Sequence, residues 1–143
     1  MSYLWLVFAL LSAITAALVS IFGKIGLQSV DANTATAVRA VIMAVFLVAV
    51  VAFQGNIGKI PSLFEDKKTL LFIVLSGAAG AASWLFYFWA LKLGKVSQVA
   101  PVDKLSVVIA TIAAVVFLGE RLSWISGIGI SLIAIGVILI AFS

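Results

Sequence analysis

Long apolar runs, separated by short polar stretches, dominate the chain. Each run holds about 20 residues, the length that an α-helix needs to cross a bilayer at a rise of about 1.5 Å per residue. The pattern predicts five transmembrane helices, at Tyr3–Phe22, Asn33–Phe53, Thr69–Leu91, Ser97–Leu118 and Ser123–Phe142. We therefore expect an all-α membrane protein.

The polar stretches between these runs are short, with one exception. The segment Gln54–Lys68 contains two glycines, Pro61 and the charged cluster Glu65–Lys68, which is typical of an exposed interfacial loop. Short connections make neighbouring helices antiparallel. An odd number of spans would place the two termini on opposite sides of the membrane.

Composition agrees with lipid as the main solvent. Of 143 residues, 65% are hydrophobic and 10% are charged, whereas soluble domains carry about 25% charged residues. The basic residues lie scattered between apolar runs, which argues against nucleic acid as a partner and leaves the lipid bilayer. The chain has no Cys and no His, so we expect no metal site, no cofactor and no enzymatic activity.

The loop charges give almost no orientation bias. If the five spans form, one side of the membrane carries four basic loop residues and the other side carries three: Lys59, Lys67, Lys68 and Arg121 against Lys24, Lys92 and Lys95. A clear excess on one side would fix the orientation. Without it, two alternatives stay open: the chain inserts in both orientations, or it inserts in one with a weak bias.

Three ionisable residues interrupt the apolar spans. Arg39 lies in the second span, and Asp103 and Lys104 lie in the fourth. Ionisable groups inside a membrane are costly and suggest function, and these three share one side at a depth of roughly 8–10 Å. Aromatic residues of the third span approach the same side, and Ser106 shares a face of small residues with Asp103. The candidates for a solute path are Arg39, Trp84, Tyr87, Asp103, Lys104 and Ser106.

Structural alternatives exist for the same residues. The guanidinium of Arg39 could pair permanently with Asp103 and lock two helices, or Arg39 and Lys104 could reach to the headgroups. In a continuous helix Asp103 and Lys104 point about 100° apart and cannot face one partner. With Ser97 as cap, Pro101 would fall in the first helical turn, where it costs little; a hinge at Pro101 is the other possibility.

The last span has no charge and carries small residues at regular spacing. Gly129 and Gly136 lie seven residues apart, and Gly127 and Ser131 lie four apart. Small residues let helices approach closely. We therefore expect these four residues to form a dimer contact rather than a solute path.

Three segments make the chain resemble a single EamA-type module of the drug/metabolite transporter superfamily. They are ALKLGKVSQVAP (Ala90–Pro101), FLGERLS (Phe117–Ser123) and GIGISLIAIGVILI (Gly127–Ile140). The resemblance implies one EamA-like transmembrane domain over residues 1–143, half of a ten-helix inverted-repeat fold, in a prokaryotic cytoplasmic (inner) membrane. Because most members carry two modules, it also implies an antiparallel homodimer with dual topology.

The last span also resembles that of small multidrug resistance proteins, with Gly129 and Gly136 at the positions of the glycines that mediate dimerisation. Those proteins couple protons through a glutamate in their first helix. Tyr3–Phe22 contains no carboxylate, so that mechanism does not carry over. Asp103 is the only acid well inside any span.

These features favour a secondary exporter of a small metabolite that works by alternating access. No GxxxxGK[ST] loop is present, so a gradient would supply the energy. Two other classes stay open. One is a structural or accessory membrane subunit. The other is a lipid flippase in which Lys24, Arg39 and Lys104 hold a headgroup phosphate.

Overall fold

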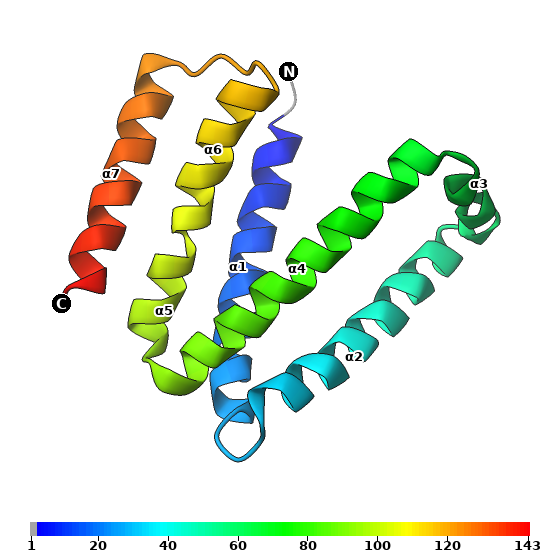
Figure 1. Ribbon diagram of the computed structural model, residues 1–143, viewed down its shortest axis with the longest axis horizontal. Coiled ribbons are helices and arrows are strands. Elements are labelled where there is room, and N and C mark those ends of the chain that lie inside the picture. The colour runs from blue at the N-terminus through cyan, green and yellow to red at the C-terminus, as the bar shows by residue number, and fades with distance from the viewer. Residues whose placement is uncertain (1–2) are drawn as a thin grey trace. The chain divides into compact units, whose positions relative to one another are not determined.

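A computed structural model describes residues 3–143, and this part of the chain is helical with no strand (Figure 1). Five stretches are long and apolar enough to cross a membrane, which confirms the predicted five spans. They are α1 (Leu4–Gly26), α2 (Ala32–Phe53), α4 (Lys67–Leu93), α5 with α6 (Val96–Phe117) and α7 (Trp124–Ala141). Most of their large apolar side chains are exposed, which is stable in hydrocarbon and would cause aggregation in water.

The first helix is longer than the sequence predicts, because it continues past Phe22 to Gly26. Two contacts hold the added turn. The amine of Lys24 donates a hydrogen bond to the carbonyl of Leu91, and the ring of Phe88 lies directly against Gly23. The lysine and the glycines thus belong to the helix and not to a loop.

The segment between α2 and α4 is exposed as predicted, but it is not irregular. It forms a 3₁₀ turn, η1 (Ile57–Lys59), and a short helix, α3 (Ile60–Glu65). Asp66 follows, and its carboxylate accepts the backbone N–H groups of Lys68 at 3.0 Å and Thr69 at 3.3 Å. The side-chain hydrogen bond from Thr69, helped by these N–H groups, lowers the pKa of Asp66.

The fourth span is discontinuous, contrary to the prediction of one unbroken helix. It consists of α5 (Val96–Asp103) and α6 (Leu105–Phe117), with Lys104 between them. Lys95, not Ser97, caps α5, so Pro101 lies beyond the first turn and has no N–H to offer the helix. Next to it, the amide of Lys104 bonds to the carbonyl of Pro101, three residues back, which is the tighter 3₁₀ pattern.

The chain divides into two compact units. One consists of Phe22–Lys92, and the other of the described residues up to Ile21 together with Leu93–Ser143. In the second unit, α7 packs against both α5 and α6. In the first unit, hydrogen bonds from side chains join the region where α2 begins to the region where α4 ends. The candidate site lies in this first unit.

Candidate functional site

A cleft of about 710 Å³ lies between α2 and α4, within the range of about 300–1,000 Å³ typical of small-molecule sites. The residues that α2 contributes recur at intervals of three or four, so they share one helical face. Most of the lining is apolar. The lining residues are Asn33, Thr36, Ala37, Arg39, Ala40, Met43, Ala44 and Leu47 of α2, with Gly77, Gly80, Ala81, Trp84 and Leu85 of α4.

Two glycines give this cleft its room. A Cβ atom added at Gly77 or Gly80 would meet no atom within 4 Å among the described residues. Small residues can allow another helix to approach closely. In this unit they instead leave space that a solute of modest size could fill.

Arg39 lies against two aromatic rings of α4. Its guanidinium carbon is 3.8 Å from the centroid of the Trp84 ring and 4.5 Å from that of Phe88. Both distances are well inside the limit of about 6 Å for a cation–π interaction. The rings of Trp84 and Phe88 are stacked, with centroids 5.7 Å apart and an interplanar angle of 26°. The sequence placed Arg39 and Trp84 among the candidates, and the structure brings them together.

The rings beneath the guanidinium form a fixed surface. Phe88 is only 3% exposed and rests against Gly23, which has no side chain to displace it. Tyr87 is also buried, with its ring edge-on to Trp84 at a centroid distance of 5.7 Å. We call Trp84, Tyr87 and Phe88 the aromatic platform. Within this platform, Tyr87 packs against Trp84 and does not line the cleft.

Within the unit of residues 22–92, no acidic side chain forms an ion pair with Arg39. Its Nε atom is buried and unpaired, and the one ion pair within the described chain joins two other residues. Asp103, its predicted partner, belongs to the other unit. The pairing of Arg39 with Asp103 therefore stays a prediction.

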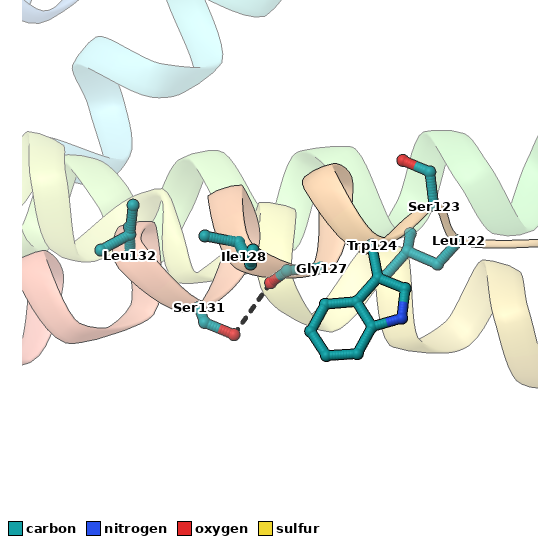
Figure 2. A pocket seen from close by; sticks show the side chains of 7 residues that line it. All are labelled: Leu122, Ser123, Trp124, Gly127, Ile128, Ser131 and Leu132. Atoms are coloured by element: carbon teal, nitrogen blue, oxygen red, sulfur yellow. Dashed lines mark hydrogen bonds between the residues drawn. The ribbon is translucent and has the colours of Figure 1, made fainter.

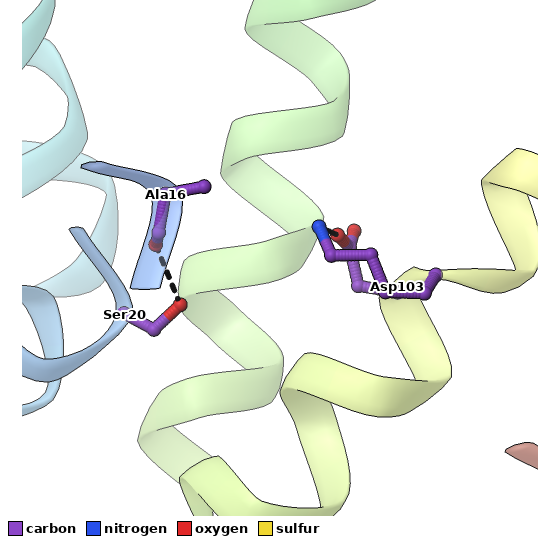
Figure 3. Close-up of polar contacts among 4 residues, drawn as sticks. Ala16, Ser20 and Asp103 are labelled. Carbon is purple, nitrogen blue, oxygen red and sulfur yellow. Dashed lines mark hydrogen bonds and ion pairs between the residues drawn. The ribbon is translucent and has the colours of Figure 1, made fainter. Parts of the chain in front are cut away.

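Asp103 is paired with its own neighbour. The Nζ atom of Lys104 lies 3.1 Å from Oδ2 of Asp103, in the contact drawn in Figure 3. Lys104 is the residue that lies between α5 and α6. The Lys104 side chain is 54% exposed, so the pair adds little stability in an aqueous setting. Ser106 lies in the same unit and is exposed.

Hydrogen bonds close one end of the cleft. Nε1 of Trp89 donates to Oδ1 of Asn33 at 2.6 Å, and Nζ of Lys92 donates to the carbonyl of Val30 at 2.8 Å. These bonds fix the start of α2 to the end of α4. Asp31 caps α2 by accepting the N–H of Thr34 at 2.9 Å, and this backbone hydrogen bond is the main cause that lowers the pKa of Asp31.

The small residues of α7 lie in a different setting. Gly127 and Ser131 help to line a groove of about 520 Å³, whose lining side chains are drawn in Figure 2. The hydroxyl of Ser131 donates to the carbonyl of Gly127 at 2.9 Å, so its donor is used within α7. Added Cβ atoms at Gly129 and Gly136 would meet no atom within 4 Å among residues 3–143. Two of the four dimer candidates, Gly129 and Gly136, therefore leave room on α7.

Sequence reasoning missed Gly23, Asn33 and Phe88. Phe88 follows Trp84 by four residues in a helix, the spacing that places two side chains on one face, so it could have been identified. Gly23 could not have been identified, because its role depends on contact with the ring of Phe88, which comes 65 residues later in the sequence.

Comparison with known proteins adds the following. The model of the EamA-like transporter family matches residues 3–142. A Sinorhizobium sp protein described as an uncharacterized transporter in the cobO 3' region is 45% identical over 141 residues, which cover 99% of each chain. An uncharacterized protein of Methanocaldococcus jannaschii is 33% identical over 81 residues, 57% of this chain and 59% of its own. No solved structure matches the chain.

Proposed function

The chain belongs to the EamA-like transporter family, and on that premise we propose that it moves a small solute across the membrane through the cleft between α2 and α4. It is a multi-pass integral membrane protein, since five helices are suited to span the bilayer. Transport, rather than catalysis, is the activity we assign to it.

One observation supports this assignment most directly. The cleft is large enough for a small molecule, and the only charged residue in its lining is Arg39. An unpaired cation within a spanning helix is expensive unless it serves a solute path or another function. Because α2 begins at Ala32, Arg39 lies about 10 Å along the helix from its start, at 1.5 Å per residue.

The mechanism that we propose is secondary export by alternating access. The sequence has no phosphate-binding loop for ATP, so an ion or solute gradient would drive the cycle. Two copies of this single domain would form a homodimer and together supply the two halves that alternating access needs. The open faces of Gly129 and Gly136 on α7 support a helix contact between the copies.

Flux measurements on purified protein test the solute path. Proteoliposomes would be loaded with radiolabelled amino acids, organic acids and nucleosides, and the efflux of each compared with that from empty liposomes. We expect at least one class to leave faster with the wild type, and Gly80→Leu, which fills the cleft, to abolish that efflux. Ala79→Leu is the matched control, because Ala79 is exposed and does not line the cleft. Equal efflux through both variants would contradict the proposal.

Labelling from the two faces of the membrane tests the antiparallel dimer. The chain has no native cysteine, so single cysteines at Gln54 and Ser143 report without background. These positions are expected on opposite sides of any one copy. Labelling of each position from both faces would support dual insertion, and labelling of each from one face only would exclude it.

A further inference from the structure

We propose that the cleft between α2 and α4 selects amphipathic anions, with a carboxylate or phosphate on Arg39 and an apolar body along α2 toward Leu47. This proposal deepens the proposed function and rests on it. Leu47 follows Arg39 by eight positions, which is about 12 Å along the helix. That length suits a short aliphatic or aromatic body.

Charge supports an anion as the ligand. Arg39 is the only charged residue in the lining, and no acidic side chain of residues 22–92 forms an ion pair with it. The rings of Trp84 and Phe88 compensate part of the charge through their π faces. An anion would complete the compensation that the apolar surroundings require.

The position of the guanidinium defines how the anion would bind. Nε of Arg39 is buried, so a solute can reach only the two terminal NH₂ groups. Those groups present two parallel donors, which match the two oxygens of a carboxylate or two oxygens of a phosphate. Because Phe88 is buried and Trp84 is stacked on it, the platform holds the guanidinium plane before a ligand arrives. Less ordering is then needed upon binding.

The remaining polar groups of the cleft do not favour a cation. Asn33 uses its oxygen to accept the indole N–H of Trp89, which leaves its NH₂ group, a donor. Thr36 is buried, and its hydroxyl donates to the carbonyl of Ala32 at 2.7 Å. An ammonium group would find no carboxylate here and would be repelled by Arg39. The cleft is thus opposite in charge to one built for cationic amines.

Four probes with one carbon skeleton test this selection. They are 4-methylpentanoate, 4-methylpentyl phosphate, 4-methylpentanamide and 4-methylpentylamine. Each would be titrated calorimetrically into the purified chain in phosphatidylcholine nanodiscs. We expect the two anions to bind saturably and to compete with each other. The amide and the amine should bind at least about tenfold more weakly, because they lose a hydrogen-bonded charge pair.

Variants separate the charge from the space. Arg39→Gln should remove the preference for anions, and Arg39→Lys should weaken binding because it keeps the charge but loses the planar fork. Gly80→Leu should abolish binding of all probes, and Ala79→Leu should retain the wild-type pattern. Equal binding of the amine and the carboxylate, or an unchanged preference in Arg39→Gln, would overturn the proposal.

Two further measurements identify the source of the anion and separate the two proposals. In nanodiscs that contain phosphatidic acid, the lipid headgroup would compete with the free anions. Binding of the free anions should be abolished if the site takes a lipid headgroup, and it should be unchanged if the site takes a free solute. Both results support an anion site. Flux of another solute without any anion binding would refute the anion site and leave transport standing. Anion binding without flux of any tested solute would refute transport and leave the anion site standing.

Discussion

Replacing Gly23 by alanine tests the packing that positions Arg39. A Cβ atom at this position would lie 2.4 Å from Cε1 and 3.1 Å from Cζ of Phe88, whereas ordinary contacts of this kind lie at 3.4–4 Å. The ring would have to move by about 1 Å. Since Phe88 is only 3% exposed, it has little free space into which to move.

The magnitude follows from two opposing effects. Overpacking of a close-packed site costs about 1–3 kcal/mol, and alanine in place of glycine inside a helix returns about 0.8–1 kcal/mol. Gly23→Ala should therefore destabilise the protein by about 0–2 kcal/mol. Gly26 is the matched control, because it belongs to the same helix and an added Cβ meets no atom within 4 Å. Gly26→Ala should be neutral, or stabilising by up to about 1 kcal/mol.

Equilibrium unfolding in mixed micelles, by titration with sodium dodecyl sulfate, would give the free energy of unfolding for both variants. Displacement of Phe88 should also disturb Arg39, whose guanidinium carbon lies 4.5 Å from that ring. We therefore expect Gly23→Ala, and not Gly26→Ala, to bind 4-methylpentanoate more weakly. Equal stability and equal binding of the two variants would refute the described packing of Gly23 on Phe88.

Three other features of the structure lead to predictions. A double-mutant cycle of Trp89→Phe and Asn33→Leu should give a coupling of about 0.6 kcal/mol, and at most about 1.7 kcal/mol, as for hydrogen bonds between membrane helices; a coupling of zero would contradict the bond. The pKa of Asp66 is lowered from 3.8, so its contribution to stability is present above that value and is lost as the pH falls through the lower, folded pKa. The NMR amide resonance of Thr69 should accordingly titrate with a midpoint below pH 3.8; a midpoint at or above pH 3.8 would exclude the lowered pKa. Gly136→Leu should reduce the cross-linked dimer without loss of the monomer fold, because the added side chain meets open space; an undiminished dimer would remove α7 from the interface.

The sequence was sufficient to predict the five spans, because each depends only on the local number of apolar residues. It was less reliable where a distant contact decides the local structure. The end of α1 continues past Phe22 because Lys24 bonds to Leu91 and Gly23 receives Phe88. Neither contact can be read from the residues near Phe22.

The candidate site was predictable in part. Arg39 and Trp84 were identified from the rarity of charge and the clustering of aromatic residues inside spans, and they do meet. The pairing of Asp103 with Lys104 was not predicted, because only a partner outside the fourth span was considered for each of them. Pro101 was the available indication of the break between α5 and α6. With Ser97 as the expected cap it fell in the first helical turn, and a hinge at Pro101 was the other possibility; the helix in fact begins at Val96.

A solute path between α2 and α4 requires that water enters this cleft within the membrane, and cysteine labelling at mid-helix reports on that entry. Ala44 lines the cleft, and Val45 is the next residue, 65% exposed and outside the lining. A membrane-impermeant maleimide reacts with a thiolate, which forms in water and not in hydrocarbon. We expect Ala44→Cys in proteoliposomes to be labelled and Val45→Cys not to be labelled. Failure of both variants to react, or reaction of Val45→Cys as fast as Ala44→Cys, would contradict the solute path.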